Sequence, residues 1–164
     1  MNLSSLLTLV KETAYYRKLL KELSQARKEL NLAIVESAKP YLIAALYREI
    51  MSPTLVISTE PKDARRLYDE LQLWCPTSTP IYLFPEPDTL PYEELSPDIV
   101  TLSGRLEVIA ALNSQRNTAS DNPNPPLIIA SAPAIMSKTI SSVDFATTSH
   151  TLKTGMSIDP VELL

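Results

Sequence analysis

Short apolar runs alternate with helical patterns along most of this chain, and this alternation restricts its possible folds more than any other feature. Three runs rich in apolar and β-branched residues, 54–59, 81–84 and 127–130, are bounded by prolines or polar turns. Between them, apolar residues recur at spacings of three and four, which is typical of helices that cover a sheet. Because parallel strands need crossover connections, the pattern predicts an α/β fold with a doubly wound parallel sheet and helices on both faces.

Further elements are expected on either side of these runs. Leucine spacing over residues 3–30 predicts two N-terminal helices, and the apolar run Leu32–Val35 predicts a buried strand. The next two helices should start near Pro40 and Pro61, because proline suits the first turn of a helix. The residues expected to point inward are Leu42, Ile43, Leu46, Tyr47 and Ile50 in the first of these helices, and Ala64, Leu67, Tyr68, Leu71 and Trp74 in the second. The second helix should end at Trp74 and Cys75.

The composition changes near residue 140, where serine, threonine and β-branched residues become frequent. This change predicts a domain boundary, with residues 1–140 forming the first domain and residues 141–164 the beginning of a second. Within the second part we expect one strand in 139–153 and the start of a helix at Asp159–Leu164. Such a remnant would be too small to build a core of its own.

Charge and composition exclude several classes of function. The formal net charge is -4 and the pI about 5.0, so the chain lacks the basic surface of a free-standing nucleic-acid-binding protein. A single Cys75 excludes an internal disulfide, and the one histidine, His150, leaves no zinc ligand set. The apolar runs are far shorter than the ~20 residues of a membrane span, and no targeting signal opens the chain. We therefore expect a cytoplasmic protein without membrane contact.

One stretch has the layout of a phosphate-binding P-loop but lacks its residues. A P-loop needs a strand, two glycines, a lysine and then a Ser or Thr before a helix. With Lys39 in the lysine position, Ala33 and Ala38 stand where the glycines belong and Pro40 replaces the Ser or Thr. Alanine brings a Cβ too close to the phosphate, and proline has no N–H or hydroxyl. Nucleotide binding should be weak or absent; an ordinary strand-to-helix turn is the alternative interpretation.

A second stretch carries a resemblance to a known family. Residues 83–98 read LFPEPDTLPYEELSPD, followed by Arg105-Leu106 and by IASAPAIM at 129–136. This pattern resembles the N-terminal, UvrB-homologous region of the bacterial transcription-repair coupling factor (Mfd), and Ser37-Ala38-Lys39 matches that family's P-loop remnant. The resemblance covers nearly the whole chain. The family's usual tryptophan in the acidic run is replaced by Pro87 or Asp88, and the glycine before the remnant is missing. The residues that carry the motif are Thr89, Leu90, Pro91, Tyr92, Glu93, Ser96, Pro97, Arg105 and Leu106.

The resemblance implies a RecA-like first domain with a degenerate P-loop, split around a second domain that binds UvrA. The parent protein would be an ATP-dependent DNA translocase that displaces stalled RNA polymerase. ATP, magnesium, DNA and RNA polymerase would then bind to downstream domains, and UvrA to the complete second domain. The DNA-clamping hairpin of UvrB has no counterpart, because Asp98 passes directly into the helix that carries Arg105. This chain itself would hold no cofactor and no metal and would contact the parent's other domains.

Two alternatives stay open at this stage. The chain could be the first lobe of a UvrB-like helicase that still binds ATP, or, less well supported, a stand-alone interaction domain. The acidic residues Glu86, Asp88, Glu93, Glu94 and Asp98 could bind a metal, although a proline-punctuated acidic loop is more often solvated surface. Tyr92 could anchor a partner or pack on the sheet. No residue is assigned a catalytic role, and His150 is expected to be structural or exposed.

Overall fold

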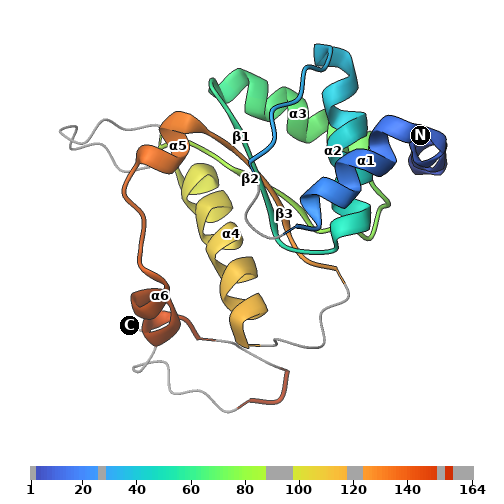
Figure 1. Cartoon of the computed structure of the whole chain (residues 1–164). Helices are drawn as coiled ribbons and strands as arrows, with labels where there is room; N and C mark the ends of the chain where they lie inside the picture. The colour runs from blue at the N-terminus through green and yellow to red at the C-terminus, as the bar shows by residue number, and fades with distance from the viewer. Residues whose placement is uncertain (1–2, 26–28, 88–97, 118–123, 151–153, 157–164) are drawn as a thin grey trace.

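The protein has an α/β architecture built on a small parallel sheet (Figure 1). This computed structural model describes residues 3–25, 29–87, 98–117, 124–150 and 154–156. The elements in chain order are η1 (Ser4–Glu12), α1 (Ala14–Leu23), η2 (Glu36–Ala38), α2 (Lys39–Ile50), β1 (Thr54–Ser58), α3 (Pro61–Trp74), β2 (Ile81–Phe84), α4 (Ile99–Asn117), β3 (Leu127–Ser131), α5 (Ala132–Met136) and α6 (Ser142–Thr148), where η denotes a 3-10 helix.

The sheet is parallel throughout, with the strand order β1-β3-β2. Leu127 at the start of β3 lies opposite Thr54 on one side and Ile81 on the other. All five residues of β3 are buried. This burial explains why its sequence is a continuous apolar run instead of an alternating one, since a central parallel strand is covered on both faces.

Helices cover the two faces of the sheet unequally. On one face, α2 and α3 together with η1 and α1 enclose the main core, which is formed by Leu7, Tyr16, Ala44, Ala45, Tyr47, Ala64, Leu71, Cys75, Leu127 and Ile129. The opposite face carries α4, which packs mainly on β2 (Figure 1). The side chains of Ile128 and Ala130 point toward this second face, because neighbours along a strand alternate.

Three predicted strands and the presence of the helices between them are confirmed. In α4, however, Leu102 and Leu106, which the pattern put on its apolar side, are 45% and 38% exposed, and Arg105 and Val108 are buried instead. The strands β1, β2 and β3 coincide with the three β-branched runs to within one residue. In α3, Ala64 and Leu71 are buried, and Leu67, Tyr68 and Trp74 pack against the core as predicted. Cys75 ends that helix, with its N–H donating to the oxygen of Leu71 at 2.8 Å.

The inward face of α2 is rotated slightly from the predicted one. Pro40, Ala44, Ala45 and Tyr47 are its buried residues, whereas Ile50 is 44% exposed. The shift follows from packing, because small alanines let α2 approach α3 closely, while the larger Leu42, Ile43 and Leu46 lie at the margin of the core.

The predicted strand Leu32–Val35 is wrong. These residues are not in a strand, and Leu32 and Val35 are 51% and 69% exposed. These apolar side chains contact helices instead of a sheet: Leu32, Ala33 and Ile34 line a groove against α1 and α2. An apolar run predicts contact with apolar neighbours, and a helix can supply these as well as a sheet can.

The predicted strand after residue 140 is also wrong where the structure describes it. Residues 142–148 form the short helix α6, which packs against α4. Its start is fixed by Ser141, whose Oγ accepts a hydrogen bond from the N–H of Asp144 at 3.1 Å and donates to the carboxylate of Asp144 at 2.6 Å. The serine cap therefore stabilises a helix here, although the β-branched composition favours a strand. The predicted helix start at Asp159–Leu164 lies outside the described residues.

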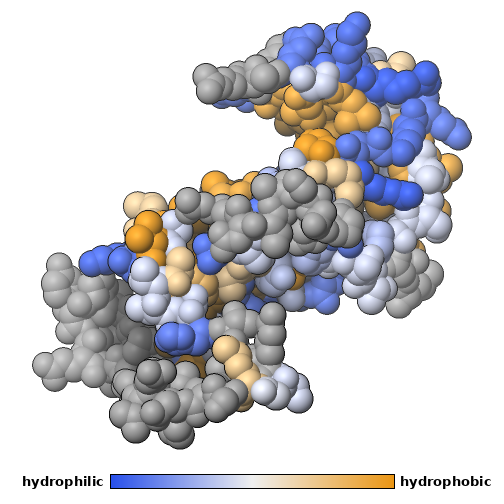
Figure 2. Space-filling model, turned by 90° about the horizontal axis from the view of Figure 1, so that it is seen from below, coloured by the Kyte–Doolittle hydropathy of each residue, from blue (hydrophilic) through white to orange (hydrophobic). Residues whose placement is uncertain are grey.

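Considerable apolar surface remains exposed. The space-filling view from below shows hydrophobic areas at several places between hydrophilic ones (Figure 2). Leu55 and Ile57 of β1 are 53% and 57% exposed, and Met136 at the end of α5 is 85% exposed. Surfaces of this kind are typical of proteins that contact other domains or other proteins. No helix in the described part of the chain is long and apolar enough to cross a membrane.

Candidate binding cleft beside the first strand

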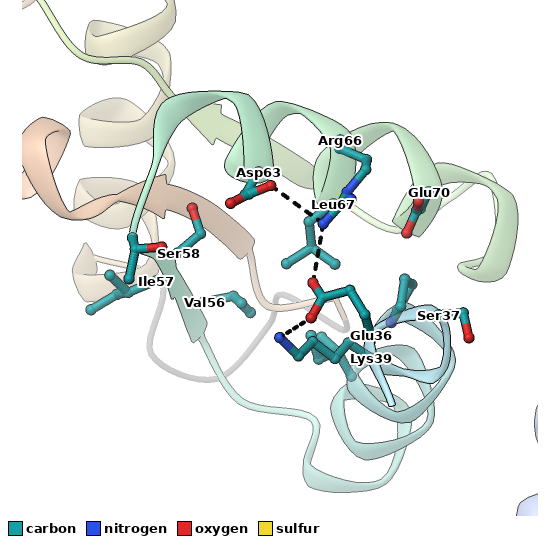
Figure 3. Close-up of a pocket in the computed structure, with 13 residues that line it drawn as sticks. Glu36, Ser37, Lys39, Val56, Ile57, Ser58, Asp63, Arg66, Leu67 and Glu70 are labelled. Atoms are coloured by element: carbon teal, nitrogen blue, oxygen red, sulfur yellow. Dashed lines mark hydrogen bonds and ion pairs between the residues drawn. The ribbon is translucent and has the colours of Figure 1, made fainter. Parts of the chain in front are cut away.

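A cleft of about 530 Å³ lies between the start of α2, helix α3 and the carboxyl half of β1 (Figure 3). Ligands of open α/β folds bind near the carboxyl ends of the strands, and the cleft lies at such a position. Its size also falls within the range of small-molecule pockets. The cleft is therefore the place to test whether the P-loop remnant can hold a phosphate.

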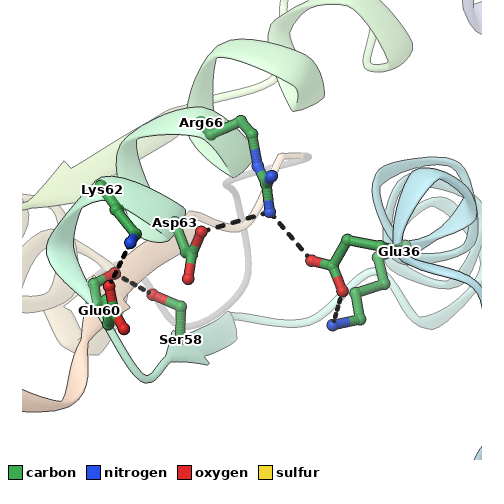
Figure 4. Close-up of polar contacts among 7 residues, drawn as sticks. Glu36, Ser58, Glu60, Lys62, Asp63 and Arg66 are labelled. Carbon is green, nitrogen blue, oxygen red and sulfur yellow. Dashed lines mark hydrogen bonds and ion pairs between the residues drawn. The ribbon is translucent and has the colours of Figure 1, made fainter.

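Ion pairs already engage the lysine of the remnant. The Lys39 Nζ lies 2.5 Å from a carboxylate oxygen of Glu36, whose other oxygen lies 3.1 Å from Nη2 of Arg66. Arg66 also pairs with Asp63 at 3.3 Å, so the chain of charges crosses the cleft from α2 to α3 (Figure 4). The hydrogen bond from Lys39 and the nearby cations lower the pKa of Glu36, which keeps its carboxylate charged.

The backbone at the lysine end of the predicted remnant is already hydrogen-bonded internally. The Ala38 N–H donates to the oxygen of Val35 at 3.0 Å, and the Lys39 N–H donates to the oxygen of Glu36. Pro40 has no N–H and is buried in the first turn of α2. Residues 38–40 therefore present no free amide hydrogen to a phosphate, whereas a P-loop depends on several.

The charge balance of the cleft also opposes a polyphosphate. Three carboxylates line it, those of Glu36, Asp63 and Glu70, against the two cations Lys39 and Arg66. Both cations are already paired, and Glu70 has no ion pair among the residues that the structure describes. An incoming triphosphate would have to displace two carboxylates and would meet a third.

Only part of the predicted remnant is brought together. Ser37, Lys39 and Pro40 line the cleft, whereas Ala33 lies in the separate groove against α1. Ala38 is half-buried and lines neither the cleft nor the groove. Sequence reasoning did not identify Glu36, Asp63, Arg66 and Glu70 as cleft residues. The spacing of Glu36 and Lys39, three residues apart at a helix start, was the one available signal, since such pairs meet on a helix.

Among the residues that carry the predicted family resemblance, Arg105 has the clearest structural role. It is 7% exposed, and its guanidinium carbon lies 4.1 Å from the centre of the Phe84 ring. Its Nη1 donates to the oxygens of Pro85 at 2.7 Å and Ala134 at 3.4 Å, and its Nη2 donates to the oxygen of Lys138 at 3.4 Å. Burial lowers the pKa of Arg105. The side chain thus ties together the ends of β2, α4 and α5.

The other predicted site residues fall into two groups. Thr89, Leu90, Pro91, Tyr92, Glu93, Ser96 and Pro97, with Asp88 and Glu94, lie outside the described residues. Leu106 is 38% exposed on α4, and Asp98 caps that helix, since its Oδ2 accepts from the N–H of Thr101 at 3.3 Å. His150 is exposed, as predicted, and the described segments contain no group of three or more His, Cys, Asp or Glu side chains that could bind a metal.

No protein-family model matches the chain, and no curated protein matches it.

Proposed function

We propose that this chain is a non-catalytic N-terminal module of a transcription-repair coupling factor. The observation that carries the proposal is the cleft beside β1, where a nucleotide would be expected and where ion pairs and internally bonded amides take the place of a phosphate cradle. The sequence resemblance supplies the family, and the parallel α/β sheet is compatible with a RecA-like, doubly wound first domain. The module acts by contacts with other domains and not by chemistry.

The catalytic work belongs, in this proposal, to the parent protein in the cytoplasm. Its downstream motor domains bind ATP and magnesium, move along DNA and displace stalled RNA polymerase, so that nucleotide excision repair can begin. UvrA binds to the complete second domain. The exposed apolar side chains of α5, Ile135 and Met136, are available for contacts with the parent's other domains.

The proposal predicts that the chain does not bind ATP. Calorimetric titration with ATP and magnesium should give no saturable heat, because residues 38–40 offer no amide hydrogen and Glu36 neutralises Lys39. Lys39→Ala should give the same flat titration. The matched variant Glu36→Ala, which releases Lys39 and Arg66, should also stay flat, since it creates no cradle.

The main alternative, a UvrB-like helicase lobe that still binds ATP, makes the opposite prediction. It requires saturable binding in the low micromolar range that Lys39→Ala abolishes. That result would overturn the assignment as a non-catalytic module.

A second prediction concerns UvrA. In surface-binding measurements with immobilised UvrA, the full-length parent should bind and the 164-residue chain should not. A specific interface buries about 800 Å² on each partner. Between residues 141 and 164 the described chain offers only the seven-residue helix α6, one side of which packs on α4. Tight binding by the 164-residue chain would place the UvrA surface on the α/β domain instead.

A further inference from the structure

The outer edge of β1 carries unused hydrogen-bonding groups. The Thr54 N–H donates to the oxygen of Pro126 at 3.0 Å, so the backbone groups of residues 54, 56 and 58 face β3. Because successive peptide groups of a strand point in opposite directions, the N–H and C=O groups of Leu55 and Ile57 face away from the sheet. In the described part of the chain, no backbone group pairs with them.

Space for another extended chain lies beside this edge. Helix α2 packs against α3 and η1 more than against β1, and the cleft described above separates α2 from the strand (Figure 3). Ile43 of α2, Val56 of β1 and Leu67 of α3 give part of its wall an apolar character. A neighbouring strand lies about 4.8 Å from its partner, which places an added chain next to β1 at the side of this cleft.

The surroundings of the edge select the chemistry of such a chain. Alternate side chains of an added strand would meet either the apolar wall of the cleft or the exposed Leu55 and Ile57 on the other face. At the carboxyl end of β1, the carboxylates of Glu36, Asp63 and Glu70 outnumber the two cations. This excess favours a lysine or arginine at the corresponding end of the added chain.

The strand lacks the features that normally protect an edge from pairing. Proteins block exposed edges with charged side chains or proline within the strand, or with a bulge. Thr54–Ser58 contains no charged residue and no proline, and it pairs with β3 in unbroken register. An unprotected edge beside an open cleft is suited to strand addition.

We infer that the outer edge of β1 is a docking site for an extended segment of a partner protein, which adds to the sheet as a fourth strand. The segment has at least four residues, with β-branched side chains at alternate positions and a basic residue near the carboxyl end of β1. This site does not depend on the transcription-repair proposal, because it uses only the strand edge and the cleft.

The test uses an array of acetylated six-residue peptides that alternate valine or isoleucine with threonine and carry lysine or glutamate at one end. The chain should bind lysine-ended peptides at least about threefold more tightly than glutamate-ended ones. N-methylation of the peptide backbone should abolish binding, because it removes the donors that pair with β1. In amide NMR spectra, the signals of Leu55 and Ile57 should shift more than that of Val56.

Two variants separate the edge from a second groove, which lies between β1, β3 and α4 and is lined by residues that include Leu55, Leu112 and Ile128. Ile57→Pro removes an outward N–H without removing a donor to β3 and should abolish binding, whereas Ile135→Lys, in the α5 wall of that groove, should leave it unchanged. If Ile57→Pro does not fold, the inference is tested on the wild-type chain by the NMR shifts of Leu55 and Ile57 and by the loss of binding on N-methylation of the peptide. Binding that survives N-methylation overturns the inference. So does protection of the Leu55 and Ile57 amides from hydrogen exchange in the unbound 164-residue chain, since another part of the chain would then fill the edge.

Discussion

Replacement of Arg105 by leucine is expected to lower the free energy of unfolding by about 2–4 kcal/mol. The guanidinium is buried and donates to three backbone oxygens, those of Pro85, Ala134 and Lys138. Leucine would leave these acceptors without a charged donor and would also remove the contact with the Phe84 ring. Relief of the desolvation of a buried charge offsets part of this loss, which is why the expected value is not larger.

Arg65→Leu provides the control for this measurement. Arg65 is an exposed arginine on α3, so its replacement should change stability by no more than about 0.5 kcal/mol. Urea unfolding followed by circular dichroism compares the two variants under the same conditions. The free energy of unfolding of Arg105→Lys should lie between those of the wild type and Arg105→Leu, because an ammonium can still donate a hydrogen bond to one of the three backbone oxygens. Equal stability of the Arg105 and Arg65 variants would mean that the side chain does not hold β2, α4 and α5 together.

The strands of the sheet could be predicted because each is a short apolar or β-branched run bounded by prolines or polar turns. The run 127–130 was predicted as a strand, and Leu127–Ser131 forms the buried central strand β3. Leu32–Val35 has a similar composition, yet its side chains meet α1 and α2 instead of a sheet. Periodicity and composition report burial, but they do not identify which element buries a run. The same limit explains α6, where a serine cap decided between helix and strand.

The candidate cleft could be located from the sequence, but its electrostatics could not. Lys39 and Pro40 marked the start of α2 and its place at the carboxyl end of the sheet. The partners of Lys39 depend on Glu36, whose second oxygen meets Arg66 thirty residues further along the chain. Contacts at that separation depend on how α2 and α3 pack, which no local pattern specifies. The open edge of β1 could not be foreseen either, because strand order does not follow from strand sequence.

Alkaline solution is expected to destabilise the protein through two buried tyrosines. Burial raises the pKa of Tyr16 and of Tyr47 from 10.0 to about 12. Since the folded state resists ionisation, the free energy of unfolding is highest below pH 10 and falls as the pH rises from 10 to 12. The expected loss is about 1–2 kcal/mol for each tyrosine. Burial also raises the pKa of the Cys75 thiol from 9.0 to about 11, so the decline should begin near pH 9.

Tyrosine-to-phenylalanine variants identify the groups responsible. The Tyr16 hydroxyl is buried and has no hydrogen-bond partner among the residues that the structure describes. Tyr16→Phe should therefore raise stability at pH 7 by about 1 kcal/mol and flatten the alkaline decline. Tyr47 donates to the oxygen of Pro125. Tyr47→Phe should therefore flatten the decline but cost about 1 kcal/mol at pH 7. Tyr15→Phe, at an 89% exposed position beside Tyr16, should change neither quantity. Urea unfolding between pH 7 and 12 measures all three, and an unchanged alkaline slope in both Tyr16→Phe and Tyr47→Phe would exclude buried tyrosines as the cause.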